Sequence, residues 1–259
     1  MKSLNLNDYI KNKINPLDSY FMSLDRPFVA LTPISYCRGL CYVAFSCGEG
    51  SDHPFIKTLN QYKLNKDLAY SDSILCSYYS KPLATAADVL ATSNSHMRNL
   101  DPLSAILPWL SWTPEKRKRF WLKTIQKENM KFSSDDIADM SGFQLFGPVS
   151  QSKGSLEFKR LVQVFNRIVD NGYIRDPNRK DGDVVGCLLV NDSNEYRVMI
   201  NSGQHRIAAA SAAHLRDIPV RFKSLGGCPR IVYRRDVLNW PNVRNNIYTA
   251  HEAIRITKP

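Results

Sequence analysis

The chain has 259 residues, of which 43% are hydrophobic, and it carries a formal net charge of +11 at neutral pH. This length and apolar content are enough to bury a core, and they exclude a wholly disordered chain. No run of about 18 apolar residues occurs, which excludes an ordinary membrane span, and the first residues lack the apolar segment of a secretion signal, so we expect a cytoplasmic protein.

The positive charge is concentrated in the second half of the chain. Residues 141–259 hold 18 Lys and Arg against 10 Asp and Glu, and thirteen of the 18 are arginines. Because the guanidinium group suits phosphate and carboxylate, this half favours an anionic ligand such as a nucleotide, a phosphosugar or nucleic acid. A solvated basic surface is the other interpretation.

Cysteine and histidine spacing indicates no metal site. None of the six cysteines forms a CxxC pair, and no Cys/His cluster has the spacing of zinc ligands. We expect free, buried thiols in a reducing compartment. His53, His96 and His251 have no carboxylate or cysteine partner in sequence, and we assign no metal to them.

Residues 1–141 are expected to form a mostly helical region that packs on the core domain and has no assigned function. Residues 27–45 have the apolar character of strands, whereas residues 68–79 and 84–90 favour helices. The apolar segment 103–112 contains tryptophans, which are typical of a core.

A basic run beside aromatic residues follows at Glu115–Trp121. This run suits contact with nucleic acid or an acidic surface, and it equally suits a solvated helix face that carries a buried Trp121. Ser133-Ser134-Asp135-Asp136 is typical of a helix start. We place the domain boundary near Gly142.

Residues 142–259 predict a compact α+β domain with a C-terminal extension. An amphipathic helix over 155–170 stops at Asn171-Gly172, and residues 184–190 and 196–200 then predict a hairpin. An alanine-rich helix follows, and further strands are expected at 218–222 and 231–233, which gives the order α-β-β-α-β. Thr249-Ala250-His251-Glu252 predicts a capping box for a final short helix.

The segment Asn201-Ser202-Gly203-Gln204-His205-Arg206 joins the second strand to the alanine-rich helix. A glycine turn at a helix start presents free N–H groups and the positive end of the helix dipole to an anion. Gly203 permits a positive φ and close approach of a phosphate, and Arg206 adds a charged planar group. The alternative is a structural cap, in which Arg206 pairs with a carboxylate and His205 bonds to a neighbouring loop.

This order of elements, with its Gly-x-His-Arg turn, resembles the ParB/sulfiredoxin superfamily. The resemblance covers about residues 147–222 and includes Gly203-Gln204-His205-Arg206 with Ala209, and Ile218-Pro219-Val220. It is closest to uncharacterised bacterial ParB-like proteins without a helix-turn-helix. The resemblance implies a ParB/sulfiredoxin-like fold in which Ser202, Gly203, Gln204, His205 and Arg206 bind nucleotide phosphates.

The chain departs from each branch of that superfamily. Gln204 stands where sulfiredoxins carry a reactive cysteine, so that reaction is not expected. The 37 residues after Phe222 leave no room for the helix-turn-helix of a partition protein. Ser202 replaces the aspartate of the free-serine kinases, which act with an upstream carboxylate base; Glu157 is the nearest candidate here, and it is equally a first-turn residue favoured by the helix dipole.

The leading functional hypothesis is a nucleotide-dependent phosphotransferase that uses ATP or ADP, or less favourably CTP, with Mg²⁺. It would act on a hydroxyl of a small molecule or glycan, with Glu157 as the base and His205 orienting the phosphates. The alternative is a nucleotide-sensing or nucleic-acid-binding module without turnover.

Overall fold

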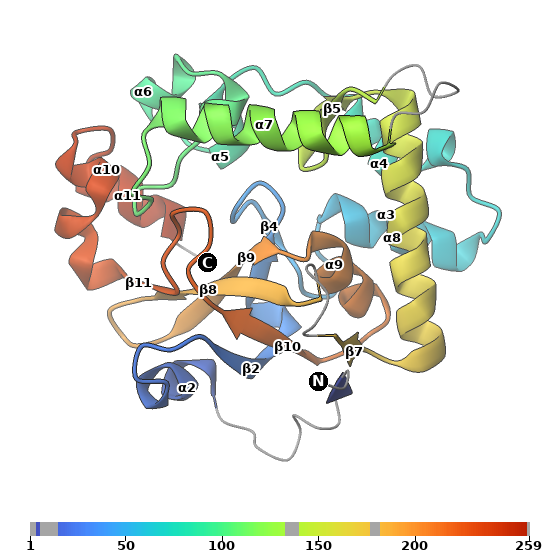
Figure 1. The fold of residues 1–259 in the computed structure, drawn as a ribbon, viewed down its shortest axis with the longest axis horizontal. Coiled ribbons are helices and arrows are strands. Elements are labelled where there is room, and N and C mark those ends of the chain that lie inside the picture. The colour runs from blue at the N-terminus through green and yellow to red at the C-terminus, as the bar shows by residue number, and fades with distance from the viewer. Residues whose placement is uncertain (1–3, 6–14, 133–139, 177–181, 258–259) are drawn as a thin grey trace. The chain divides into compact units, whose positions relative to one another are not determined.

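The computed structural model of the chain describes residues 4–5, 15–132, 140–176 and 182–257, which form a mixed α+β structure (Figure 1). The chain divides into two compact units. The first, which we call the sheet unit, comprises Met1–Asn60 and Leu161–Asp236 with the last residue of the chain, and the second, the helical unit, comprises Gln61–Arg160 and Val237–Lys258.

A mixed sheet forms the sheet unit, and seven of its strands lie in the described residues. Its spatial order is β2 (Phe28–Pro33), β10 (Asp217–Phe222), β8 (Val184–Val190), β9 (Tyr196–Ser202), β3 (Cys37–Gly39) and β4 (Phe45–Ser46). Strand β11 (Ile231–Tyr233) also pairs with β8. β10 and β11 run parallel to β8, whereas β9 runs antiparallel to it. A separate short ladder joins β1 (Leu4–Asn5) to β7 (Ile174–Arg175).

The central strand β8 is buried along its whole length, as its unbroken apolar sequence predicts. It forms the predicted hairpin with β9, and Asn191 closes the turn by accepting the N–H groups of Ser193 and Glu195 on Oδ1. Gly186 lets the neighbouring strands approach, because a Cβ there would lie 2.7 Å from Val198 Cγ1. The hairpin is therefore fixed by local sequence and by close packing.

Two helices follow the predicted pattern with different limits. The amphipathic helix α8 (Gln151–Asn171) begins four residues earlier than the predicted start at Ser155, and it ends before Gly172, whose φ is +71°. In its sheet-unit part the apolar face of the helix is buried at Leu161, Phe165 and Ile168, whereas Val169 is 57% exposed. The alanine-rich helix is α9 (Gln204–Ala212), whose residues from Ile207 onward are buried. Helix α2 (Pro16–Met22) precedes β2.

Short helices and one long helix form most of the helical unit. The helices that belong to it entirely are α4 (Ile74–Tyr79), α5 (Ala86–Leu90), α6 (Ser95–Arg98), α7 (Pro114–Phe132), α10 (Pro241–Arg244) and α11 (Ala250–Thr257). Helix α3 (Pro54–Leu64), like α8, supplies residues to both units. Strands β5 (Gly142–Phe143) and β6 (Phe146–Val149) form a hairpin. The predicted capping box starts α11, with Thr249 and Glu252 bonded reciprocally.

Buried contacts attach the C-terminal segment to the helical unit. Asn242, which is 1% exposed, donates from Nδ2 to the carbonyls of Leu107 and Leu110, each at 2.9 Å. The Trp240 and Trp109 rings meet edge to face at 5.3 Å. Trp109 therefore lies in the core as predicted, and residues 237–258 belong with the segment 101–112.

The two units differ from the division that we expected near Gly142. Because β2 pairs with β10 and β3 pairs with β9, residues 28–39 belong to the same sheet as the predicted second domain. Residues 54–132 are mostly helical, as expected of the first half, and residues 28–46 are largely strand, in agreement with the strand character predicted for residues 27–45. The predicted helix start at Ser133–Asp136 lies outside the described residues. Within the described residues no helix is both long enough and apolar enough to span a membrane.

Candidate functional site

The candidate site is the turn between β9 and α9, residues 202–206. Gly203 has φ of +90° and caps the helix, and its carbonyl accepts the N–H groups of Arg206 and Ile207, each at 3.0 Å. A Cβ at this position would lie 3.0 Å from Val184 Cα, so both the backbone angle and the packing require glycine. The N–H of Gln204, at the first helical position, has no carbonyl to donate to within the helix.

A β-bulge aims the end of β9 into this turn. Val185 pairs with Ser202 and Gly186 pairs with Ile200, so Asn201 is the extra residue. The amide Nδ2 of Asn201 is buried and has no hydrogen-bond partner among the described residues. Ser202, predicted to bind phosphate, is half-buried at the last strand position. The bulge thus leaves a buried amide donor two residues before the glycine.

The side chain of Gln204 holds the turn against the β3–β4 connection. Its Oε1 accepts the N–H of Leu40 at 2.9 Å, and its Nε2 donates to the carbonyl of Ile200 at 2.8 Å. Gly39 makes room for this contact, since a Cβ there would lie 2.5 Å from Gln204 Oε1. We predicted that Gln204 contacts phosphate, but its side-chain amide is hydrogen-bonded to the backbone of Leu40 and Ile200. Its backbone N–H, at the first position of the helix, is the group that remains for an anion.

The β3–β4 connection that Gln204 contacts has a strained backbone. Leu40, Cys41 and Tyr42 have φ values of +46°, +43° and +69°, and Leu40 is fully buried. Each left-handed non-glycine residue costs on the order of 1 kcal/mol, and such residues cluster at functional sites. Arg38 supports the segment by donating from Nε to the carbonyl of Val43 at 2.7 Å.

Two histidines from distant parts of the sequence lie near one another in the sheet unit. The half-buried His205 ring lies 5.1 Å from the Phe55 ring, which in turn lies 5.6 Å from the His53 ring. Complete burial lowers the pKa of His53 to about 3, and the charge of His205 adds to this effect against an opposing backbone hydrogen bond. His53 is therefore neutral at physiological pH.

The proton of neutral His53 resides on one defined nitrogen. Its Nδ1 accepts the N–H of Phe55 at 3.2 Å, so Nε2 carries the proton. This Nε2 group is buried and has no hydrogen-bond partner among the described residues. His53 is thus a neutral donor close to His205, and it was not assigned to the site from the sequence because it precedes His205 by 152 positions.

Arg206 differs from the other arginines near the turn. The Asp183 carboxylate accepts hydrogen bonds from both Arg175 and Arg221, and Arg175 is 8% exposed. In contrast, half-buried Arg206 forms no ion pair with any carboxylate in the described part of the chain. The structural-cap alternative, which requires such a pair, receives no support from these residues. The excess positive charge at the helix start favours an anionic ligand.

Glu157, the predicted base, lies in the helical unit, whereas the 202–206 turn lies in the sheet unit. Its side chain is 2% exposed, and its Oε1 accepts a hydrogen bond from Arg160 Nη1 at 2.6 Å. Because α8 starts at Gln151, Glu157 is in the second turn, so the first-turn dipole interpretation is wrong. Its neighbour Lys153 is also buried, and burial lowers the pKa of that amine.

The cysteines and acidic residues offer no obvious second chemistry. Burial raises the pKa of Cys47 to about 12 and raises the pKa of Cys37 well above its ordinary value, so these thiols are poor nucleophiles. Within the described ranges, no three His, Cys, Asp or Glu side chains are grouped so that they could hold a metal ion. Mg²⁺ is usually held by ligand phosphates with one or two carboxylates, so its binding does not require such a group.

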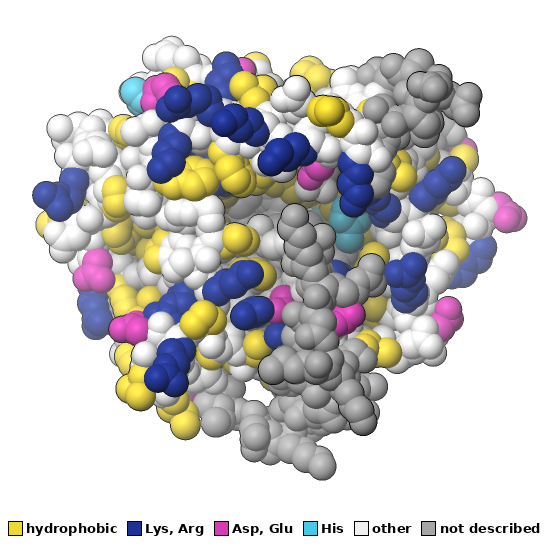
Figure 2. Space-filling view, in the orientation of Figure 1, with side chains coloured by type: hydrophobic (Ala, Val, Ile, Leu, Met, Phe, Trp, Pro, Cys, Tyr) yellow, Lys and Arg dark blue, Asp and Glu magenta, His cyan; other side chains and the backbone are white. Residues whose placement is uncertain are grey.

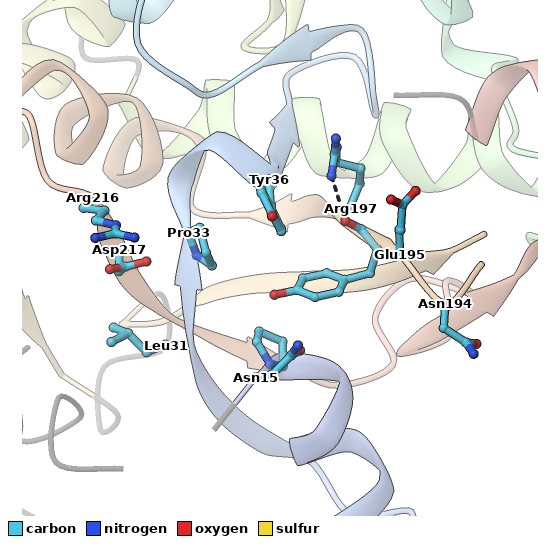
Figure 3. Close-up of a pocket in the computed structure, with 11 residues that line it drawn as sticks. Asn15, Leu31, Pro33, Tyr36, Asn194, Glu195, Arg197, Arg216 and Asp217 are labelled. Atoms are coloured by element: carbon cyan, nitrogen blue, oxygen red, sulfur yellow. Dashed lines mark hydrogen bonds between the residues drawn. The ribbon is translucent and has the colours of Figure 1, made fainter. Parts of the chain in front are cut away.

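A cavity of about 600 Å³ opens at the other end of β9 in the sheet unit (Figure 3). The Tyr36 and Tyr196 rings form its aromatic wall and meet edge to face at 5.4 Å, and the Arg197 guanidinium lies 4.8 Å from the Tyr36 ring centroid. Burial raises the pKa of Tyr196 to about 12. Since β9 has seven residues, at about 3.3 Å each this cavity is roughly 20 Å from the turn along the strand. None of the predicted site residues lines it.

Comparison of the chain with protein-family models, with curated proteins and with solved structures gave no significant match.

Proposed function

We propose that the 202–206 turn binds the phosphate groups of a nucleotide. The observation that carries this proposal is a half-buried arginine, Arg206, in the first turn of α9 with no carboxylate paired to it in the described residues. The Gly203 backbone and the N–H groups at the helix start support the same ligand, because a phosphate receives both hydrogen bonds and the positive end of the dipole.

The proposed fold relationship is to the ParB/sulfiredoxin superfamily. In support, α8, β8, β9, α9 and β10 occur in this order along the chain, with the two-residue strand β7 between α8 and β8, and β8 lies between β9 and β10 in the sheet. The turn that carries Gly203 and Arg206 joins β9 to α9, which is where the resemblance expects the phosphates.

The proposed reaction is phosphoryl transfer from ATP to a hydroxyl of a small molecule or glycan, with Mg²⁺ carried by the nucleotide. The acceptor oxygen forms a bond to the terminal phosphorus, the bond to the leaving ADP breaks, and the hydroxyl proton passes to a carboxylate. Arg206 would hold phosphate oxygens and His205 would orient them. Glu157, the base that the resemblance implies, belongs to the other unit, so its part in the reaction is tested separately by substitution. A nucleotide-sensing or nucleic-acid-binding module without turnover is the alternative.

Thermal-shift titrations with ATP, ADP, CTP and GTP, each with and without Mg²⁺, test the proposal. A bound nucleotide at 100 times its Kd stabilises the native state by about 2.7 kcal/mol. Arg206→Ala is expected to abolish this stabilisation. The matched control is Arg235→Ala, which removes an exposed arginine from the same unit and should preserve it. If no nucleotide stabilises the wild-type chain, the phosphate site is refuted.

A measurement of ATP hydrolysis distinguishes a phosphotransferase from a module that binds nucleotide without turnover. If the chain is a phosphotransferase, slow ATP hydrolysis should accompany binding, and Glu157→Gln should abolish hydrolysis while leaving nucleotide affinity unchanged. Binding without hydrolysis would favour a nucleotide-sensing module. Hydrolysis that persists in Glu157→Gln would assign the base to another carboxylate.

A further inference from the structure

Helix α7 of the helical unit exposes a row of cations on one face. Lys116, Arg119, Lys123 and Lys127 are separated by three, four and four residues, so their side chains project from the same side of the helix. We call these four residues the basic stripe. Figure 2 shows dark-blue side chains in a row over α7. At 1.5 Å per residue, the stripe extends about 16 Å along the helix axis.

The carboxylates of α7 do not neutralise this stripe. The helix contains two, Glu115 in the first turn and Glu128 in the last two turns. Glu128 is turned toward Lys153 of α8, with 3.7 Å between Oε2 and Nζ, so its charge is compensated inside the unit. Lys123 and Lys127 enter no ion pair with any described carboxylate. The stripe therefore keeps a net positive charge, although Glu115 attracts Arg119 one turn away on the same helix.

Contacts on the opposite face of α7 hold the helix rigid. The half-buried Trp121 ring lies 4.8 Å from the Phe143 ring, which is 4% exposed. The Arg117 guanidinium lies 4.5 Å from the centroid of the same tryptophan, and Arg117 is itself 7% exposed. The side with the aromatic residues therefore packs inward, and the stripe is presented outward on a straight support.

We propose that the basic stripe is a docking surface for the phosphate backbone of duplex DNA. A rigid linear row of cations complements a rigid duplex, whose phosphates form an equally regular row. A membrane surface would favour a continuous apolar face, but the exposed apolar residues of α7, Phe120, Leu122 and Met130, are interrupted by the cations. Single strands bind largely by stacking on aromatic side chains, and Phe120, at 39%, is the one exposed aromatic residue in the described part of α7.

The salt dependence of DNA binding by the full chain tests this surface. Fluorescence anisotropy with a labelled duplex of random sequence should give a slope of log K against log salt of about −3.6 for four phosphate contacts, so that affinity falls about 150-fold between 50 and 200 mM salt. The triple variant Arg119→Gln, Lys123→Gln, Lys127→Gln should have a slope of about −0.9 and lose affinity only about 3.5-fold over that range. Glutamine preserves helix propensity, and far-UV circular dichroism checks the fold.

The matched control removes the same charge from other exposed positions of the helical unit, with Lys159→Gln, Arg244→Gln and Arg255→Gln. The slope of log K against log salt for this control should equal the wild-type slope to within about 0.9, which corresponds to one phosphate contact. An equal loss of slope in the control would overturn the proposal, because binding would then depend on net charge alone. Lack of duplex binding at 50 mM salt would also overturn it, as would tighter binding to a single strand or to phosphatidylserine vesicles. Arg206→Ala should leave DNA binding unchanged, which separates this surface from the nucleotide site.

Discussion

The contact between Gln204 and the β3–β4 connection is tested by Gly39→Ala. The φ of Gly39 lies outside the left-handed region, so alanine is compatible with the backbone, but its Cβ would lie 2.5 Å from Gln204 Oε1. The amide must therefore move and lose its hydrogen bonds to Leu40 and Ile200. Leu40 is fully buried, so its N–H would be left without an acceptor. An orphaned buried donor costs about 1–3 kcal/mol and a lost hydrogen bond about 1 kcal/mol, which together predict a destabilisation of about 2–4 kcal/mol.

A double-mutant cycle with Gln204→Ala isolates this contact. Once the amide is removed, the alanine at position 39 meets no obstruction from it, so the double variant should be about as stable as Gln204→Ala alone. The expected coupling therefore equals the whole loss of Gly39→Ala, about 2–4 kcal/mol in magnitude. Urea unfolding should be followed by far-UV circular dichroism, because all four tryptophans lie in the helical unit and do not report on the sheet unit. Hydrogen exchange at the Leu40 amide should accelerate in both single variants.

Additive losses in this cycle would refute the reasoning. In that case the alanine would act through another neighbour, and Cys47 Sγ at 3.3 Å is the next atom in its way. Unchanged exchange at Leu40 would contradict the hydrogen bond itself.

Three further predictions concern single residues. The folded-state pKa of His53, about 3, lies below its ordinary value of 6.5, so the unfolded chain takes up a proton first as the pH falls. Stability should decrease by about 1.4 kcal/mol per pH unit below 6.5 from this group alone, and urea midpoints at pH 7 and 5 should differ less in His53→Asn. Asp183→Asn should destabilise the chain by about 3 kcal/mol because it removes the negative charge that faces the buried Arg175 guanidinium, whereas the exposed control Asp192→Asn should cost under about 1 kcal/mol in the same urea assay. Asn242→Ala should cost about 2–4 kcal/mol by removing two buried hydrogen bonds, and tryptophan fluorescence, which reports on the helical unit, should show the earlier transition.

Local sequence patterns were sufficient to predict the elements around the site. The apolar run of β8, the second hairpin strand at residues 196–200, the alanine-rich α9 and the stop at Gly172 each depend on a few adjacent residues, and each is present. The glycine turn was likewise predictable, because only the strand, the glycine and the helix start were needed.

The parts that were missed depend on contacts between distant residues. Gln204 accepts a hydrogen bond from Leu40, which is 164 positions away in the sequence. The residues of the turn alone therefore suggested that Gln204 contacts phosphate, and they gave no sign of this structural contact. The pairing of β2 with β10 similarly joins residues nearly 190 positions apart, and a single boundary near Gly142 could not represent it. The place of Glu157 in its helix depended on where α8 begins. That helix starts at Gln151, where Ser150 caps it by accepting the N–H of Lys153 on Oγ, whereas we expected the start at Ser155.

The most direct test of the nucleotide site is an amide chemical-shift titration of the isotopically labelled chain with Mg²⁺–ATP. The account predicts saturable shifts at the amides of Gly203, Gln204, His205 and Arg206, together with the guanidinium resonance of Arg206, and no such shifts in Arg206→Ala. Shifts that are absent from these residues, or that are confined to another part of the chain, would contradict the account.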